Sequence, residues 1–416
     1  MASYAFERKV PVYDRADIVV VGGGPAGVAS AIAAARSGKR VILAEHSGQL
    51  GGMGTLANVS IFMGVGNVTG IYREIVSEVL PAQGLPDHHE GSIWPQFNPF
   101  RLRHYLNEKL EKEGVEVLFH AGFCGTVMES DQVKAVVLNT REGLLALEAQ
   151  VFIDCTGDGR VAIDAGASYT TGREADGMTQ PMTLMFMMQN TGRPVRRELP
   201  EGGYRYEDVS ELPQGRLLHW EQGDEGTLLV NMTRVKGNGA SVKDVSRAEK
   251  EALRQVFSVA DYLQRNGFEN YILSHVPGQT GVRETNQIHG EYVLAEEDVV
   301  SGRRFPDVVA QTNYEIDIHN PDGRGGTDER KVSGYDIPYR CLLPKGIRGL
   351  LVAGRAISAT HVAMSSMRVQ ATCYALGQSA GIAASLAAEH GLPLSEINID
   401  ELHRELERQD VRFLKG

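Results

Sequence analysis

A short turn near the N-terminus carries glycines at a spacing that suits the binding of phosphate groups. The first glycine of a GxGxxG pattern permits a tight turn, the second lets a pyrophosphate approach the backbone, and the third lets a helix pack closely on a strand. An acidic residue, Glu45, follows about 20 positions later, where a carboxylate accepts hydrogen bonds from ribose hydroxyls. We therefore predict a dinucleotide site formed by Gly22, Gly24, Pro25, Ala26, Gly27 and Glu45.

Histidine, arginine and tyrosine residues in the second half of the chain could take part in proton transfer or substrate binding. Asp317 and His319 alternate along an expected strand, so the carboxylate could orient the imidazole, and either a catalytic or a structural role fits His319. No third ligand for a metal ion can be assigned beside them, and we predict no metal site. Arg283 and Arg368 could each bind a substrate carboxylate or phosphate, or form an internal ion pair. Tyr314 could donate a proton, but a buried core tyrosine explains it better.

The elements around the glycine turn follow a strand–turn–helix–strand order. Residues 18–21 are a run of β-branched and aliphatic side chains, which is typical of a buried parallel strand. Residues 28–37 predict a helix, which Gly38 ends, and residues 40–44 predict a second strand. A phosphate bound at the turn would then lie at a helix N-terminus, where free N–H groups and the helix dipole favour negative charge.

The remaining elements indicate two units. We expect helices over residues 71–80 and 101–113, a strand over 115–120, and an antiparallel meander over 126–129, 135–139 and 144–148, before a strand over 151–154. From about residue 168 the chain is more polar, with strand-like runs over 182–188 and 228–232 and a helix over 246–266. Near the C-terminus we expect a strand over 349–353, a long helix of small residues over 367–388 and a charged amphipathic helix over 399–409.

The predicted fold class is α/β, with one domain inserted into the other. A Rossmann-like dinucleotide-binding domain, with a parallel sheet, flanking helices and the β-meander, would be discontinuous and comprise residues 1–167 and 335–416. An α+β substrate or cap domain would occupy residues 168–334.

Five further motifs follow the glycine turn. They are LGGMGT at residues 50–55, FIDCTGDG at 152–159, GVRE at 281–284, GLLVAGRAIS at 349–358 and GQSAG at 377–381. Together with the glycine turn they resemble the glutathione-reductase-type FAD superfamily. More narrowly, they resemble the FAD-dependent oxidoreductase family related to fumarate-reductase, thiazole-synthase and tRNA-uridine-modifying flavoproteins. The resemblance covers most of the chain, and the motifs occur in the expected order.

This resemblance implies FAD as the cofactor, and the motif positions imply further contacts. The cofactor would be held non-covalently, because no histidine or cysteine lies where a covalent link to the flavin is obvious. The contacts implied for FAD are Gly51, Gly52, Thr55, Thr156, Gly157, Asp158 and Gly354, and we add Arg368 to them. Many members of the superfamily have Asp where this chain has Arg355. We expect Arg355 to meet the pyrophosphate or an anionic substrate instead.

The resemblance also places His361 beside the flavin ring, between Gly354–Arg355 and the final long helix. A histidine there could take the second proton during hydride abstraction, although it could equally do no more than hydrogen-bond a loop carbonyl. The helix that begins near residues 365–367 would point its N-terminus at the flavin, where its dipole would stabilise negative charge on the reduced ring. Our catalytic candidates are His361, His319, Arg283 and Arg355.

The amino-acid composition limits the kinds of partner and the cellular compartment that we expect. The 416 residues are 42% hydrophobic and 23% charged, as in a soluble enzyme of more than one domain. A net charge of −11 disfavours nucleic acid as a partner. The N-terminus lacks the apolar run of a signal peptide, and residues 371–388 are too rich in Ala, Gly and Ser for a membrane span.

The cysteine pattern adds a prediction about location. The four cysteines form no CxxC pair, and Cys155 and Cys373 lie in apolar runs that predict buried thiols. We expect a cytoplasmic protein without disulfides or a membrane partner, which acts on a small-molecule substrate and could form a homo-oligomer.

These features favour an FAD-dependent dehydrogenase or oxidase. It would transfer a hydride from a small polar organic substrate, at a C–H beside a hydroxyl or amine, to flavin N5. The sequence does not indicate whether the electron acceptor is oxygen, a quinone or a protein. A flavin-dependent monooxygenase is an alternative, but no second GxGxxG motif supports an NAD(P)H domain. RNA modification is disfavoured by the acidic charge. A non-catalytic FAD- or NAD-binding protein is the last alternative, and no substrate would reduce it.

Overall fold

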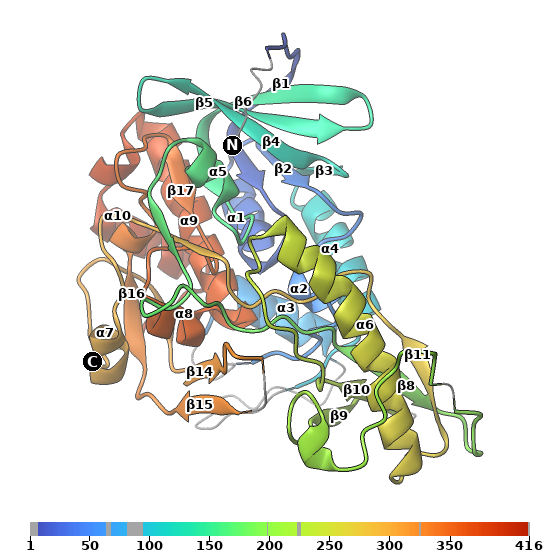
Figure 1. Cartoon of the computed structure of the whole chain (residues 1–416). Helices are drawn as coiled ribbons and strands as arrows, with labels where there is room; N and C mark the ends of the chain where they lie inside the picture. The colour runs from blue at the N-terminus through green and yellow to red at the C-terminus, as the bar shows by residue number, and fades with distance from the viewer. Residues whose placement is uncertain are drawn as a thin grey trace.

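A mixed β-sheet forms the centre of the larger unit (Figure 1). The computed structural model describes residues 7–63, 68–80, 95–197, 199–222, 226–323 and 326–414. In this part of the chain the sheet has the order β3-β2-β1-β6-β5-β4, and β17 also pairs with β6. Its strands are β1 (Val12–Val21), β2 (Val41–Glu45), β3 (Glu116–Phe119), β4 (Gly122–Glu129), β5 (Gln132–Thr140), β6 (Gly143–Asp154) and β17 (Leu350–Val352). The predicted α/β fold with a Rossmann-like sheet is confirmed.

Strand β6 joins the parallel and antiparallel parts of this sheet. We expected two strands, over residues 144–148 and 151–154, but β6 is one strand of 12 residues. Parallel pairing with β1 continues from Ala146 to Asp154 and keeps the intervening residues extended. The first half of β6 also pairs with β5 of the predicted meander, and its end pairs with β17. One long strand therefore carries the chain from the meander to the carboxyl edge of the parallel strands.

Two helices pack against each other beside the sheet at unusually short range. They are α1 (Pro25–Arg36) and α9 (Gln370–His390). A Cβ atom at Gly377 would lie 2.0 Å from the carbonyl oxygen of Ala26, and one at Gly381 would lie 2.3 Å from that of Ser30. The small residues of α9 are therefore required by packing. Most of α9 is buried, and no helix of the described residues is long and apolar enough to cross a membrane.

The end of the chain contains a helix break that we did not predict. Residues 361–388 include α8 (His361–Met367) before α9, with Arg368 and Val369 between the two helices. The other helices of this unit are α2 (Met53–Leu56), α3 (Ile71–Val79), α4 (Pro99–Lys112), α5 (Arg160–Asp164), α7 (Glu296–Ser301) and α10 (Ile399–Arg408). The break exposes the N-terminus of α9, with Val369 and Gln370, to the cavity described below.

A second, smaller unit projects beyond the main sheet (Figure 1). Its antiparallel sheet has the order β11-β8-β10-β9, and the long helix α6 packs on it around a hydrophobic core of its own. Its elements are β8 (Phe186–Asn190), β9 (His219–Gln222), β10 (Thr227–Val230), α6 (Val242–Arg265) and β11 (Tyr271–His275). We call this unit the cap.

Short strand pairs connect the cap with the main sheet. They are β7 (Tyr169–Thr171) with β12 (Asn286–Ile288), β13 (Val308–Thr312) with β16 (Tyr335–Pro338), and β14 (Ile316–His319) with β15 (Thr327–Arg330). Buried side chains of β13 and β16 belong to the same core as the main sheet. The boundaries proposed at residues 168 and 334 stay a prediction.

Candidate active site

A cavity of about 510 Å³ extends from the glycine turn to the cap. The turn between β1 and α1, the end of β2 and the end of β6 line one end of it. Side chains of the cap, of β14 and of the α8–α9 break line the other end. Because the carboxyl ends of parallel strands meet at one edge of a sheet, this is where α/β folds bind their ligands.

Two glycines of the turn are required by the protein's own packing. Gly22 has a φ of 105°, and a Cβ atom there would lie 2.4 Å from the carbonyl oxygen of Cys155. A Cβ atom at Gly27 would lie 1.7 Å from the carbonyl oxygen of Gly22. Both distances are far shorter than atoms can approach without a bond. These glycines therefore let α1 begin directly against β1 and β6.

Gly24 differs from both, because the protein itself does not demand a glycine there. Its φ of −73° suits any residue, and a Cβ atom would come no closer than 3.9 Å to another protein atom, the Cα of Gly52. Gly24 lines the cavity at the N-terminus of α1. The open space over this backbone fits a pyrophosphate, which needs the close approach that a side chain would prevent.

Glu45 lies at the end of β2, in the position expected for a ribose acceptor. One carboxylate oxygen accepts a hydrogen bond from the backbone N–H of Gly23 at 2.7 Å, and the other accepts one from Ser47 at 2.7 Å. His46 Nδ1 also lies 2.9 Å from the second oxygen. Burial acts to raise the pKa of Glu45, but the contacts with His46 and Ser47 outweigh it and lower the pKa. The carboxylate is therefore ionised, and its remaining lone pairs can accept ribose hydroxyls.

Arg355 links the end of β6 to the cap side of the cavity. Its guanidinium pairs with Asp158 at 2.6 Å, donates to the carbonyl oxygen of Gly157 at 2.8 Å and also donates to that of Val282. Thr285 donates a further hydrogen bond to Asp158 at 3.0 Å. Asp158 therefore neutralises the unusual arginine, and together they hold the segment that carries Arg283.

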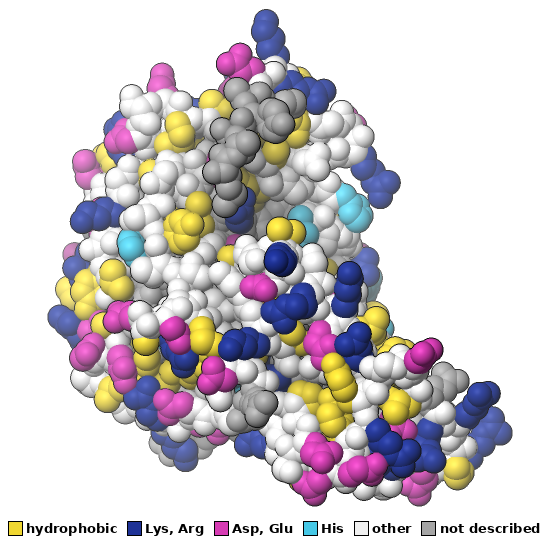
Figure 2. Space-filling model, in the orientation of Figure 1, with side chains coloured by type: hydrophobic (Ala, Val, Ile, Leu, Met, Phe, Trp, Pro, Cys, Tyr) yellow, Lys and Arg dark blue, Asp and Glu magenta, His cyan; other side chains and the backbone are white. Residues whose placement is uncertain are grey.

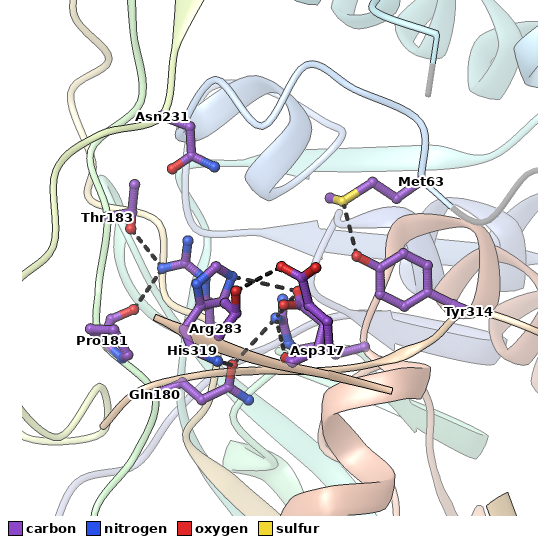
Figure 3. A network of polar contacts seen from close by, with 12 residues as sticks. Met63, Gln180, Pro181, Thr183, Asn231, Arg283, Tyr314, Asp317 and His319 are labelled. Atoms are coloured by element: carbon purple, nitrogen blue, oxygen red, sulfur yellow. Dashed lines mark hydrogen bonds and ion pairs between the residues drawn. The ribbon is translucent and has the colours of Figure 1, made fainter. Parts of the chain in front are cut away.

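Arg283 also lines the cavity, beside Pro181 and Thr183 (Figure 3). Its guanidinium donates to the carbonyl oxygen of Pro181 at 2.7 Å and to Thr183 Oγ1 at 2.6 Å. Burial lowers the pKa of Arg283 to about 9, and the positive charge of Arg368 contributes to the shift. An arginine remains protonated at neutral pH under these conditions. Both described hydrogen-bond partners are neutral, so neither of them compensates the positive charge of the guanidinium.

Asp317, His319 and Arg368 complete this end of the cavity. Arg368 pairs with Asp317 Oδ2 at 3.1 Å, and His319 Nε2 lies 3.5 Å from the same oxygen. Gln180 Oε1 accepts a hydrogen bond from the backbone of His319 at 3.2 Å and one from Arg368 at 3.3 Å. Figure 3 shows Asp317 and His319 lying between Gln180 and Tyr314. The predicted alternation of Asp317 and His319 on β14 thus brings their side chains together.

The two titratable side chains of β14 have pKa values displaced in the same direction. Burial lowers the pKa of His319 to about 3, and the charge of Arg283 adds to this effect. Burial acts to raise the pKa of Asp317, but the contact with His319 and the charges of Arg368 and Arg283 hold it well below its usual range. At neutral pH the cluster therefore contains a carboxylate and an uncharged imidazole.

Comparison with known protein families gives one decisive match. The profile of the FAD dependent oxidoreductase family matches residues 17–406, which is nearly the whole chain. The chain belongs to this family. FAD is accordingly its cofactor, and the open space at Gly24 and the ionised Glu45 fit that cofactor. No match was found among curated proteins.

One solved structure supports the same fold for this flavoprotein. A geranylgeranyl bacteriochlorophyll reductase-like protein from Thermoplasma acidophilum shares 13% sequence identity and a TM-score of 0.52, over 96% of this chain and 84% of that one. An identity this low shows the fold alone. A myxobacterial FAD-dependent chondrochloren halogenase is also similar, with 16% identity and a TM-score of 0.47, over 95% of this chain and 79% of that one.

The flavoprotein brings most of the predicted site residues to the cavity. Those that line it are Gly22, Gly24, Pro25, Ala26, Glu45, Gly52, Thr156, Gly157, Asp158, Arg283, His319, Gly354, Arg355 and Arg368. Arg368, which we had assigned to the cofactor, lies in the cluster with Asp317 and His319. Their individual roles towards FAD or substrate stay predictions.

Four predicted residues lie behind the cavity wall: Gly27, Gly51, Thr55 and His361. Thr55 closes a turn by donating to the carbonyl oxygen of Leu50 at 2.6 Å. His361 is the first residue of α8, and its Nδ1 lies 2.6 Å from a carboxylate oxygen of the fully buried Glu284. His361 does not line the cavity, and its catalytic role stays a prediction.

Several residues that shape the site were not predicted. Gln180 and Thr183 hold His319, Arg368 and Arg283, but they belong to no motif. Trp220 lines the cavity from strand β9 of the cap. These residues reach the site through cap packing and the isolated bridge between Thr183 and Gly281. No local sequence pattern predicts these contacts.

Proposed function

We propose that this flavoprotein oxidises a small polar organic molecule by hydride transfer from a C–H beside a hydroxyl or amine to N5 of FAD. FAD is held non-covalently along the cavity, with its pyrophosphate over Gly24 and its ribose at Glu45. When bound, FAD supplies the acceptor for the hydride. The observation that carries the proposal is that one cavity joins this cradle to the polar cluster of Arg283, Asp317 and His319.

The protein's own residues supply a base and the groups that orient the substrate. As hydride leaves carbon, the hydroxyl or amine of the substrate must lose a proton, and a positioned base accelerates this step. His319 is the candidate base: its imidazole is uncharged at neutral pH, Asp317 lies 3.5 Å from it, and a bound anion would offset the charges of Arg283 and Arg234 that lower its pKa. Arg283 and Arg368 would orient the substrate. The N-terminus of α9, at Val369 and Gln370, would favour negative charge on the reduced cofactor.

Anaerobic reduction of the purified, FAD-loaded protein tests this proposal. Alcohols, amines, sugars, and hydroxy and amino acids would be mixed with it, and the flavin absorbance at roughly 450 nm followed. We expect one class to bleach the flavin and His319→Gln to slow the bleaching by about 100-fold, within the range for loss of a general base. His390→Gln, on the surface, should bleach at the wild-type rate. Bleaching by NAD(P)H alone would instead support the monooxygenase, and bleaching by nothing would support a non-catalytic protein.

A further inference from the structure

We infer that the substrate is a small organic acid with an apolar body, whose carboxylate binds between Arg283 and Arg368 and whose body lies against the cap. The inference rests on the proposed function, because it names the substrate class of the same cavity. The two arginines alone could bind either a carboxylate or a phosphate. The charge balance of the cluster favours an anion, and the apolar lining of the cavity favours an organic carboxylate over phosphate.

The charge balance at this end of the cavity leaves positive charge uncompensated. Arg283 donates only to neutral groups among its described partners. Behind it, the buried Arg234 donates to Thr183 Oγ1 at 3.0 Å and Asn231 Oδ1 at 2.8 Å, which are also neutral. A buried charge is costly unless a counterion is near. The cluster is therefore built to receive an anion.

Among the described residues, Asp317 is the carboxylate whose charge acts on all three guanidinium groups. Asp317 pairs with Arg368 at 3.1 Å and so compensates one charge. Glu329 also lines the cavity, but it pairs with Arg216 at 3.3 Å, and both side chains are about half exposed, at 43% and 54%. The excess remains on the Arg283 side of the cluster, beside His319. A bound carboxylate there would place an adjacent C–H and hydroxyl or amine within reach of the imidazole.

The cap contributes an apolar wall to the cavity. Met185, Leu218 and Trp220 line the cavity from the cap, and Met185 packs in a small hydrophobic cluster with Leu229 and Trp220. Val59 joins the same cluster from the main unit. Such a surface gains free energy by contact with apolar groups. A phosphate, which presents polar oxygens in all directions, would leave this wall unused.

The geometry of Arg283 leaves donors free for a carboxylate. Arginine presents N–H donors in a planar fork that matches the two oxygens of a carboxylate. The hydrogen bonds that Arg283 donates to Pro181 and Thr183 come from one terminal nitrogen, Nη1. A planar carboxylate can therefore use the rest of the fork without displacing Pro181 or Thr183.

Binding can be tested without turnover, because a ligand beside the oxidised flavin perturbs its visible spectrum. The FAD-loaded protein would be titrated with benzoate, acetate, benzamide and inorganic phosphate at constant ionic strength. We expect saturable binding of benzoate, weaker binding of acetate, and no saturation with benzamide or phosphate. Saturable binding of phosphate but not benzoate would overturn the inference, as would equal binding of benzamide and benzoate.

Variants locate the site. Arg283→Lys and Arg368→Gln should each weaken benzoate binding by about 10- to 100-fold, as expected for loss of one charge-assisted contact. Trp220→Ala should weaken benzoate more than acetate. Arg348→Lys is a matched control, because this arginine is exposed and pairs with Asp131 outside the cavity. Unchanged benzoate affinity in both Arg283→Lys and Arg368→Gln would place the anion elsewhere and overturn the inference.

The two proposals fail in different ways. If uncharged alcohols or amines bleach the flavin while benzoate does not bind, hydride transfer stands and the organic-acid class falls. If benzoate binds at the arginines but no hydroxy or amino acid reduces the flavin, the anion site stands and the hydride reaction falls.

Discussion

At the scale of single residues, glycines of one turn serve different purposes. Gly27 makes room for the protein backbone, whereas the space over Gly24 is free of protein atoms. We predict that Gly24→Ala folds normally but binds FAD about 100-fold more weakly, which corresponds to about 2.7 kcal/mol. Equilibrium dialysis with FAD and thermal unfolding of the apoprotein would measure the two effects separately.

The control for this prediction is Gly125→Ala in β4. A Cβ atom there would lie 3.6 Å from a carboxylate oxygen of Asp164, which is an ordinary contact, and Gly125 does not line the cavity. It should bind FAD as the wild type does. An unchanged FAD affinity in Gly24→Ala would show that the pyrophosphate does not cross this turn.

The lowered pKa of His319 leads to a prediction about how the stability of the protein depends on pH. Its pKa is lowered from 6.5 to about 3 in the folded state, whereas the unfolded chain takes up the proton near its ordinary value. The contribution of His319 to stability is therefore present above about pH 6.5 and is lost as the pH falls towards the folded pKa. Between pH 6 and 4 the free energy of unfolding should fall by about 1.4 kcal/mol per pH unit through this group.

The variant His319→Gln isolates that contribution. Urea unfolding of wild type and variant at several pH values should give a stability difference that changes steadily with pH over this interval. A difference that stays constant from pH 6 to 4 would mean that the imidazole is not buried uncharged.

At the scale of elements, one buried contact joins α8 to the segment that carries Arg283. Glu284 accepts a hydrogen bond from the backbone N–H of Gln180 at 2.9 Å and contacts His361 Nδ1 at 2.6 Å. Removing either side chain leaves a buried polar group without its partner. We predict that His361→Ala and Glu284→Gln each lower the free energy of unfolding by about 2–3 kcal/mol.

A double-mutant cycle would test whether this contact acts as a unit. The double variant should lose less stability than the sum of the single variants, because they remove the same interaction. The exposed pair of His390 and Glu401, at 3.1 Å, is a matched control and should contribute less than about 1 kcal/mol. Additive losses in the buried pair would contradict the coupling. FAD-loaded His361→Ala should still bleach with substrate, since His361 does not line the cavity.

Elements also explain what the sequence could predict. The order of β1, α1 and β2 was predicted, because the turn and the helix are encoded locally, although β1 begins at Val12 and α1 at Pro25, before the expected residues 18 and 28. Strand β6 was divided in two, since the pairing with β1 that keeps it extended is long-range. The long helix expected over residues 367–388 corresponds to α9, whereas the short helix α8 before it was not predicted.

The cofactor end of the site could be predicted from sequence motifs. The end near Arg283 could not, because tertiary packing assembles it. Glycine and acidic motifs identify the cofactor end, whereas Gln180 and Thr183 reach the other end through contacts with the distant Glu284 and Gly281. His361 follows Gly354 closely in sequence, which suggested a place beside the ring. The first turn of α8 instead directs its side chain to Glu284.

At the scale of the whole molecule, charge is distributed unevenly. The chain carries a net charge of −11, yet the cavity end near Arg283 is locally positive. On the face shown in Figure 2, acidic and basic side chains are interspersed, without a large field of one sign. An anionic substrate would therefore be selected by the cluster at short range, since exposed charges further away than about 10 Å are screened by salt.

The cavity also joins the two units, and FAD should therefore stabilise both. Gly24 and Glu45 line it from the main unit, and Met185 and Trp220 from the cap. A ligand that binds only the folded state adds about 2.7 kcal/mol at 100 times its dissociation constant. We predict this increment for wild type and Gly125→Ala, and its loss in Gly24→Ala at the same FAD concentration. Hydrogen exchange should show added protection both at the start of α1 and around Met185. Protection confined to α1 would mean that FAD binds without joining the cap to the main unit.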